Sequence, residues 1–173
     1  FFTLHSSFPT LHSSLFTSHF SLFPLNFSLF TFHFPMRYSF IIPVYNRPDE
    51  VDELLDSLTR QSVKDFEVIV VEDGSAVTCS DVCAKYADRL DLHYFQKPNS
   101  GPGQSRNYGV ERAKGEYVLI LDSDVVVPEG YLKAVNDELE ANPADAFGGP
   151  DCAHPSFTDT QKAISYSMTS FFT

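Results

Sequence analysis

Two carboxylates stand one residue apart where an apolar run ends, in Asp122-Ser123-Asp124. The preceding residues, 117–121, are aromatic, aliphatic or β-branched, as in a buried strand. Concentrated negative charge at the end of such a strand is unfavourable unless a cation binds there, and carboxylate oxygens suit Mg²⁺ or Mn²⁺. Such an ion commonly bridges one or two carboxylates to substrate phosphates. The alternative is a turn whose Asp residues cap a helix that begins near Pro128.

Two further polar clusters follow apolar runs in the same way. One is Pro-Val-Tyr-Asn-Arg at residues 43–47, and the other is Glu-Asp-Gly-Ser at residues 72–75. A tyrosine ring can stack on a nucleobase, and a carboxylate accepts hydrogen bonds from base or ribose groups. Tyr45 and Asp73 are therefore candidates for contact with a nucleotide, although neither residue alone is specific evidence. Capping of a helix is the alternative role for Asp73.

A glycine-rich segment leads into a predicted helix at residues 99–107, Asn-Ser-Gly-Pro-Gly-Gln-Ser-Arg-Asn. Its glycines allow a close backbone approach to a ligand, and the free N–H groups at a helix start favour anions. Arg106 would add positive charge near a nucleotide. A plain loop with a surface arginine is the alternative for this segment.

The elements that must position these clusters alternate between strand-like and helix-like patterns. Apolar runs predict strands at 38–42, 66–71, 92–95 and 117–121. Helices are predicted at 48–58, 80–90 and 101–114, and again after Pro128. This order predicts an α/β fold with a mainly parallel sheet flanked by helices. In such sheets ligands bind beyond the carboxyl ends of the strands, where strand order reverses, so the clusters should meet at one edge.

Net charge limits the partners of this protein. The chain carries 23 acidic and 12 basic residues, for a formal net charge of -11. Such a field repels a phosphate backbone, so we expect no nucleic acid partner. A nucleoside diphosphate is also an anion, and an acidic protein that binds one needs a divalent cation or local backbone donors.

Residues 1–35 differ in composition from the rest of the chain. They contain no Asp, Glu, Lys or Arg and consist mostly of Phe, Ser, Leu, Thr and His. The segment lacks both the basic start of a secretory signal and the unbroken apolar run of a transmembrane helix. We expect it to be a low-complexity leader that is disordered or not native, with Met36 as the natural start. Residues 36–173 are then expected to form one partial domain.

Four segments in order closely resemble the motifs of glycosyltransferase family 2, namely residues 39–47, 70–75, 101–107 and 121–124. The resemblance implies the GT-A fold, which is Rossmann-like. It also implies inverting transfer of a sugar from a nucleotide-diphosphate donor, often a UDP-sugar, to the hydroxyl of a glycan, a lipid-linked molecule or another acceptor.

The same resemblance implies roles for individual residues. Base and ribose contacts fall to Pro43, Tyr45 and Asp73, with Arg47 nearby. Asp124 would be the principal ligand of Mg²⁺ or Mn²⁺, and Asp122 would lie beside both the ribose and the metal. The expected nucleotide-binding residues are therefore Pro43, Tyr45, Arg47, Asp73, Arg106, Asp122 and Ser123, and the expected metal ligands are Asp124 and Asp122.

The family's general base resembles an Asp or Glu well downstream of the Asp-x-Asp motif, whereas here the chain ends at Thr173. We expect the catalytic base to lie beyond Thr173 and the GT-A domain to be incomplete at its C-terminus. The alternative function is therefore a truncated, inactive nucleotide-binding fragment. Asp122-Ser123-Asp124 also fits haloacid-dehalogenase-type phosphatases, but that motif belongs on the first strand of its domain, and three predicted strands precede it here.

Three cysteines, Cys79, Cys83 and Cys152, are too few for a disulfide framework or a four-ligand zinc site. We interpret Cys79 and Cys83 as buried or half-buried thiols rather than metal ligands. The sparse cysteines indicate a reducing compartment. The expected location is cytoplasmic, with peripheral association at the inner face of a membrane as an alternative and no transmembrane span.

Overall fold

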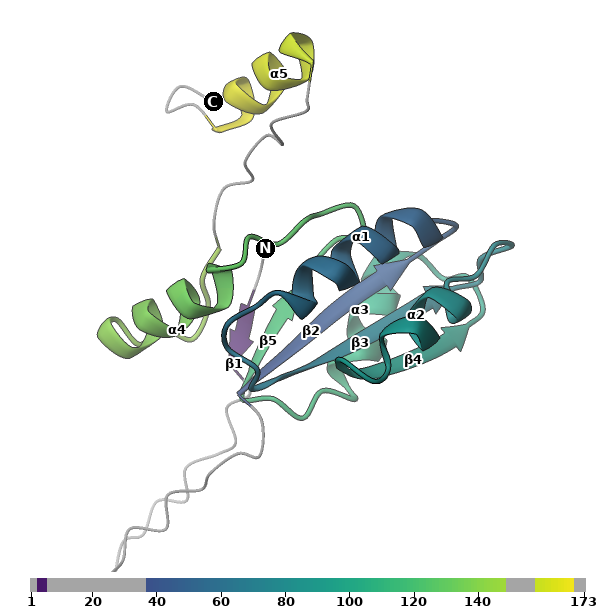
Figure 1. Ribbon diagram of the computed structural model, residues 1–173, viewed down its shortest axis with the longest axis horizontal. Helices are drawn as coiled ribbons and strands as arrows, with labels where there is room; N and C mark the ends of the chain where they lie inside the picture. Colours follow the sequence, from purple (N-terminus) through teal and green to yellow (C-terminus); the bar gives the residue numbers. More distant parts are fainter. Residues whose placement is uncertain (1–2, 6–36, 149–157, 170–173) are drawn as a thin grey trace, which may run out of the picture.

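The computed structural model describes residues 3–5, 37–148 and 158–169 and contains a five-stranded sheet of order β1-β5-β2-β3-β4 (Figure 1). The short strand β1 (Thr3–His5) pairs antiparallel with β5. The other four strands run parallel to one another. They are β2 (Tyr38–Val44), β3 (Phe66–Asp73), β4 (Asp91–Lys97) and β5 (Tyr117–Ile120). The predicted α/β fold with a mainly parallel sheet is confirmed. Apart from β1, the predicted leader lies outside the described residues.

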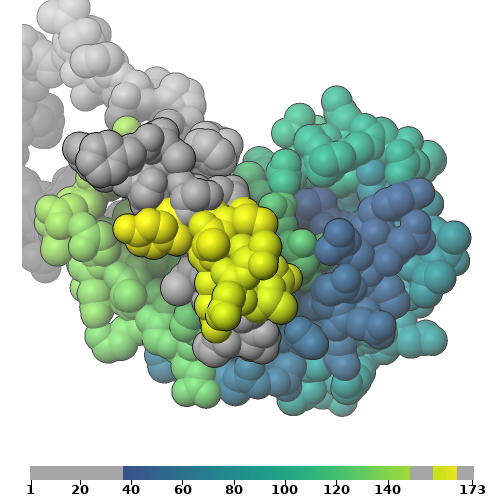
Figure 2. Space-filling model, turned by 90° about the horizontal axis from the view of Figure 1, so that it is seen from above, coloured from purple at the N-terminus to yellow at the C-terminus, as the bar shows by residue number. Residues whose placement is uncertain are grey.

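Helices cover both faces of the sheet (Figure 1). The covering helices are α1 (Pro48–Thr59), α2 (Ser80–Tyr86), α3 (Pro102–Val110) and α4 (Tyr131–Ala141), and a further helix, α5, spans Asp159–Thr169. Buried residues of α1, α2 and α4 share one apolar cluster, whereas residues of α3 pack on the opposite face. Helix α5 stands apart from the sheet and from the other helices (Figure 1), and in the view from above it is the yellow segment nearest the viewer (Figure 2). No helix in the described part of the chain has the length and apolar character needed to cross a bilayer.

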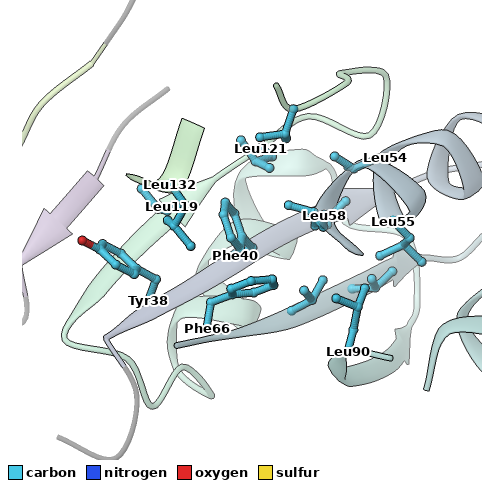
Figure 3. Packing of buried hydrophobic residues seen from close by; sticks show 14 of the residues in the cluster. Tyr38, Phe40, Leu54, Leu55, Leu58, Phe66, Leu90, Leu119, Leu121 and Leu132 are labelled. Atoms are coloured by element: carbon cyan, nitrogen blue, oxygen red, sulfur yellow. The ribbon is translucent and has the colours of Figure 1, made fainter. Parts of the chain in front are cut away.

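The larger core lies between the sheet and helices α1, α2 and α4. Figure 3 shows Phe40 and Phe66 at its centre, with Leu54 and Leu58 of α1 above them. The two phenylalanine rings meet edge to face, with centroids 5.3 Å apart and an interplanar angle of 88°. Because helices cover both faces, β2 and β3 are buried throughout and appear in the sequence as nearly continuous apolar runs.

The first predicted strand was expected to end before Pro43, but β2 continues to Val44. The Ile41 carbonyl accepts a hydrogen bond from the N–H of Leu121 at 3.0 Å, so every second residue of β2 directs its backbone groups towards β5. Pro43 is two residues further on and has no N–H for that side. Because β5 has already ended at Ile120, no ladder hydrogen bond is lost.

Helix α2 ends four residues before the predicted boundary at Leu90. After Tyr86 the chain forms a turn in which the N–H groups of Arg89 and Leu90 both donate to the Tyr86 carbonyl, at 2.9 and 3.0 Å. This turn brings the Leu90 side chain into the core. Burial of Leu90 therefore takes precedence over continuation of the helical pattern.

The strand order places a topological switch point between β2 and β5. From β2 the chain moves to β3 and then β4 on one side, and it returns to pair β5 with the other side of β2. Ligands of open α/β sheets bind in the crevice at the carboxyl ends of the strands where the order reverses. The loops after Val44 and Ile120 flank that position.

Candidate active site

The loops after β2 and β5 meet through Arg47 and Asp124. Arg47 precedes the first residue of α1, and its Nη1 atom donates to Asp124 Oδ2 at 3.1 Å. Both side chains are about half exposed. The sequence therefore identified two side chains that converge at the switch point, although 77 positions separate them.

The second carboxylate of the Asp-x-Asp motif is held by the other predicted arginine. Arg106 of α3 donates from Nη2 to Asp122 Oδ1 at 2.7 Å. Its Nε atom is buried and has no hydrogen-bond partner among the described residues. Exposed ion pairs of this kind are worth only about 0–1 kcal/mol, so a ligand can replace them at small cost. Each carboxylate of the motif thus has one arginine neighbour.

Asp73 anchors the glycine-rich loop that precedes α3. One carboxylate oxygen accepts from the N–H of Gly101 at 2.8 Å, and the other accepts from the N–H of Ser100 at 2.9 Å and from the ammonium of Lys97. Burial by itself would raise the pKa of the Asp73 carboxyl, but these hydrogen bonds outweigh it and hold that pKa below its usual value. These contacts go to the loop before α3 and not to the N–H groups of its first turn, so capping of a helix by Asp73 is not observed, and its contact with a nucleotide stays a prediction.

The loops after β2 and β3 are tied together by Asn46. Its side-chain Oδ1 accepts from the N–H groups of Ala76 and Val77 at 2.7 and 3.1 Å. Asn46 has a φ of 55°, in the left-handed region that Asn tolerates better than most residues. Its neighbour Tyr45 is 53% exposed, so the phenol ring is presented at the carboxyl edge of the sheet.

Glycine is required at position 74 of the loop after β3. Gly74 has a φ of +71°, and a Cβ atom there would lie 2.6 Å from the backbone nitrogen of Asn99. The Asn99 side chain also donates to the carbonyl of Asp73 at 2.9 Å. The end of β3 and the glycine-rich loop therefore pack backbone against backbone.

Glu72 is an internal anchor that the sequence analysis gave no role. Its buried carboxylate accepts from the N–H of Cys79 at 2.8 Å, from the Cys79 thiol at 2.9 Å and from the Tyr94 hydroxyl at 3.1 Å. The contact with Cys83, burial and the nearby carboxylate together raise the pKa of the Cys79 thiol. Cys79 and Cys83 are both free and buried, which confirms their interpretation as buried thiols. Cys152 lies outside the described residues.

The remaining predicted residues differ in accessibility. Pro43 is buried within β2, and Ser123 is only 8% exposed, whereas the acidic residues on either side of it in the sequence are accessible. The side chains of Asp122 and Asp124 are 64% and 54% exposed. Two accessible carboxylates are a donor set that fits Mg²⁺ or Mn²⁺ shared with phosphate oxygens. Roles for Pro43 and Ser123 in nucleotide binding stay predictions.

Lys97 is the partner of Asp73 that sequence reasoning missed. It ends β4, and its ammonium also donates to Ser100 Oγ at 2.5 Å. Only 10% of its side chain is exposed, although lysine is almost never deeply buried without a partner. The available signal was its position: β4 is the third parallel strand, and Lys97 is the residue at its carboxyl end.

The family described as glycosyl transferase family 2 matches residues 39–170. One similar protein is the poly(ribitol-phosphate) beta-N-acetylglucosaminyltransferase TarS of Staphylococcus aureus, which is 40% identical over 116 residues, 65% of this chain and 20% of the relative. Another is the uncharacterized glycosyltransferase EpsJ of Bacillus subtilis, at 32% identity over 111 residues, 64% of this chain and 32% of the relative.

Solved structures show the same similarity. The crystal structure of S. aureus TarS 1-349 in complex with UDP-GlcNAc matches with a TM-score of 0.59 and 37% identity, over 61% of this chain and 32% of that chain. The mannosyltransferase PcManGT of Pyrobaculum calidifontis, in complex with GDP-Man and Mn2+, matches with a TM-score of 0.57 and 28% identity, over 62% and 33%. This chain spans about a third or less of the length of these proteins. From residue 39 to residue 170 it has the sequence pattern, and over its sheet the GT-A architecture, of glycosyl transferase family 2, to which it therefore belongs.

Proposed function

We propose that this chain carries the donor-binding part of an inverting glycosyltransferase that moves a sugar from a UDP-sugar to an acceptor hydroxyl. The observation that carries the proposal is the pairing of Arg47 with Asp124 and of Arg106 with Asp122 at the switch point of the sheet. Two cations and two carboxylates in one place suit a ligand that combines a diphosphate with a divalent metal. The UDP-GlcNAc complex of TarS supports the choice of a uridine nucleotide.

Each part of the donor has a matching group at this edge. The exposed ring of Tyr45 offers a stacking surface for the base. Arg47 and Arg106, whose side chains are both partly exposed, offer positive charge and N–H groups to the diphosphate. Asp73 keeps the start of α3 in place, so that the loop before it presents its backbone at a fixed position.

Asp122 and Asp124 would hold Mg²⁺ or Mn²⁺. When bound, such an ion acts as a Lewis acid and stabilises the charge that develops on the departing diphosphate. The two arginines would then lose their carboxylate partners and be available to phosphate oxygens. This exchange keeps the site near neutral charge before and after the donor binds, which limits the repulsion expected in a protein of net charge -11.

A second candidate function is nucleotide binding without turnover. This alternative is favoured because the match covers only 32% of the TarS 1-349 structure. On this view the donor binds as proposed, but sugar transfer needs groups that the chain does not supply. The sparse cysteines and the two buried free thiols support a reducing, cytoplasmic location for either function.

Isothermal titration of the full chain with UDP, with and without Mn²⁺, tests the donor site. We expect Asp124→Asn to lower the Mn²⁺-dependent affinity for UDP at least tenfold. Asp137→Asn is the matched control, because Asp137 is an equally exposed carboxylate with one lysine partner on α4. Equal UDP binding by wild type and Asp124→Asn would refute the proposal. Release of the sugar from UDP-GlcNAc then separates the two candidate functions.

A further inference from the structure

A second group of metal-binding side chains lies at the other end of the sheet from the candidate active site. Glu67 comes from the start of β3, and Asp91 and His93 come from the start of β4. Glu67 pairs in register with Asp91, and His93 is two residues further along the same strand. Because side chains alternate along a strand, all three are on one face of the sheet, the face that α3 covers.

The ligand atoms of the three side chains converge on one point. His93 Nε2 lies 3.3 Å from Glu67 Oε2 and 3.3 Å from Asp91 Oδ1. Glu67 Oε2 and His93 Nε2 are buried, and neither makes a hydrogen bond within the described residues. Bonds of 2.0–2.2 Å in tetrahedral zinc sites place neighbouring ligand atoms about 3.3 Å apart. The separations are therefore those of ligands around one ion.

The surroundings orient the carboxylate and leave a path from solvent. The other oxygen of Glu67 accepts from Ser39 Oγ and from the N–H of Lys114, both at 2.6 Å. Such outer contacts fix the orientation of a metal ligand. The side chains of Asp91 and His93 are 51% and 33% exposed, so an ion can enter and a water molecule can complete the coordination.

A protonated His93 paired with the two carboxylates is the rival arrangement. A single N–H can point at only one acceptor, yet Nε2 is equally distant from both oxygens and has hydrogen-bond geometry to neither. The remaining cation near Glu67 is Lys114, whose Nζ lies 4.0 Å from Oε2. A fully buried carboxylate beside a second acid is better neutralised by a divalent ion than by these contacts.

We propose that Glu67, Asp91 and His93 form a zinc site that clamps the edge strand β4 to β3. One imidazole and two carboxylates with an open fourth position are a ligand set that Zn²⁺ accepts. The Asp122–Asp124 pair offers oxygen atoms alone and suits Mg²⁺ or Mn²⁺ instead. The two sites lie at opposite ends of the sheet, so the zinc site does not depend on the proposed donor binding.

Titration of the full chain with Zn²⁺ tests this site. We expect His93→Gln and Asp91→Asn each to weaken Zn²⁺ binding at least tenfold, and Zn²⁺ to raise the Tm of the wild type but of neither variant. Both residues are partly exposed, so these variants should fold. Asp88→Asn, an exposed carboxylate near the start of β4, is the control and should bind like the wild type. The wild type and the three variants share every histidine except His93. Zn²⁺ binding by those other histidines is therefore the same in all four proteins and does not affect the comparison.

Two outcomes would overturn the zinc site. One is equal Zn²⁺ affinity in the wild type, His93→Gln and Asp91→Asn. The other is a wild type whose Tm does not respond to Zn²⁺, which would leave the group as a buried ion pair. An Asp122→Asn variant separates the two metal sites, because it should lose Mn²⁺-dependent UDP binding and keep the zinc response.

Discussion

The guanidinium of Arg47 lies 3.1 Å from the carboxylate of Asp124 and joins the loops that follow two neighbouring parallel strands. This contact lies at the point where the strand order reverses. The charge of Arg47 compensates that of the Asp124 carboxylate. Because the carboxylate is half exposed, a metal ion can still reach it. Arginine and a divalent ion therefore compete for the same oxygen atoms, and this competition can be measured.

Replacing Arg47 with methionine should have opposite effects on metal and nucleotide. Removal of an exposed ion pair worth about 0.2–1 kcal/mol should raise the affinity of the apoprotein for Mn²⁺ by up to about fivefold. Affinity for UDP should fall, because the diphosphate loses a cation. Titrations with Mn²⁺ and then with UDP check both effects. Arg60→Met is the control, since Arg60 is similarly exposed but pairs with Asp56 of α1, away from the Asp-x-Asp motif. A parallel fall in both affinities would contradict the competition.

Replacing Asp73 with asparagine should destabilise the fold by about 3 kcal/mol, because Lys97 would remain buried without its charged partner. The folded-state pKa of Asp73 lies below its ordinary value of 3.8. Its contribution is therefore fully present above pH 3.8 and is lost as the pH falls through the folded-state pKa. Urea unfolding at several pH values should show that the free energy of unfolding of Asp73→Asn is lower than that of the wild type by the same amount from pH 8 to 5. This difference in the free energy of unfolding should become smaller below about pH 4. A difference that grows there would exclude this explanation.

The sequence could predict where Asp73 lies but not what holds it. A polar cluster after an apolar run, in an alternating order of strands and helices, is sufficient to place a residue at the carboxyl edge of a parallel sheet. Its partners Lys97, Ser100 and Gly101 come from a segment whose approach depends on the tertiary path of the chain. Periodicity carries no information about such contacts.

The position of Glu67 in the sequence already indicates a buried acid with a partner. Glu67 is a single acid inside the apolar run 66–71, and in a strand buried on both faces such a residue requires a partner. The sequence did not identify that partner, because Ser39, Lys114 and His93 lie 28, 47 and 26 positions away. Strand register alone brings His93 to it.

Gly74→Ala should lower the free energy of unfolding by about 1–3 kcal/mol. The left-handed φ of +71° is unfavourable for alanine, and the new Cβ would lie 2.6 Å from the Asn99 nitrogen, a backbone atom that cannot rotate away. Gly103→Ala serves as the control because Gly103 lies in the first turn of α3 and a Cβ there would meet no atom from other parts of the structure within 4 Å. Chemical denaturation of the two variants measures the difference. Equal stability would mean that the loop after β3 is free to shift.

Asn46→Gly should show how much of the stability depends on the side-chain hydrogen bonds of Asn46 and how much depends on its backbone conformation. Glycine keeps the left-handed φ of 55° at no steric cost but removes the acceptor for Ala76 and Val77, so a loss of about 1 kcal/mol is expected. Asn46→Asp keeps an acceptor oxygen and should retain most of the stability. UDP affinity should fall in the glycine variant, because the adjacent Tyr45 and Arg47 are then less firmly held. If the aspartate variant were the weaker of the two, these hydrogen bonds would not be the cause.

Tyr45→Ala should reduce the affinity for UDP without changing the stability of the fold. The ring is 53% exposed, so its removal leaves no cavity, and the Tm should stay within about one degree of the wild type. Stacking of a base on an aromatic ring is worth about 1–3 kcal/mol, which corresponds to a loss of about fivefold to 150-fold in affinity. Tyr45→Phe keeps the ring and should bind UDP nearly as well as the wild type. Val126→Ala, at another exposed apolar side chain, controls for loss of surface area. If Tyr45→Ala bound UDP as tightly as the wild type, the base could not bind at the end of β2. The arginine pairs alone would then define the nucleotide site.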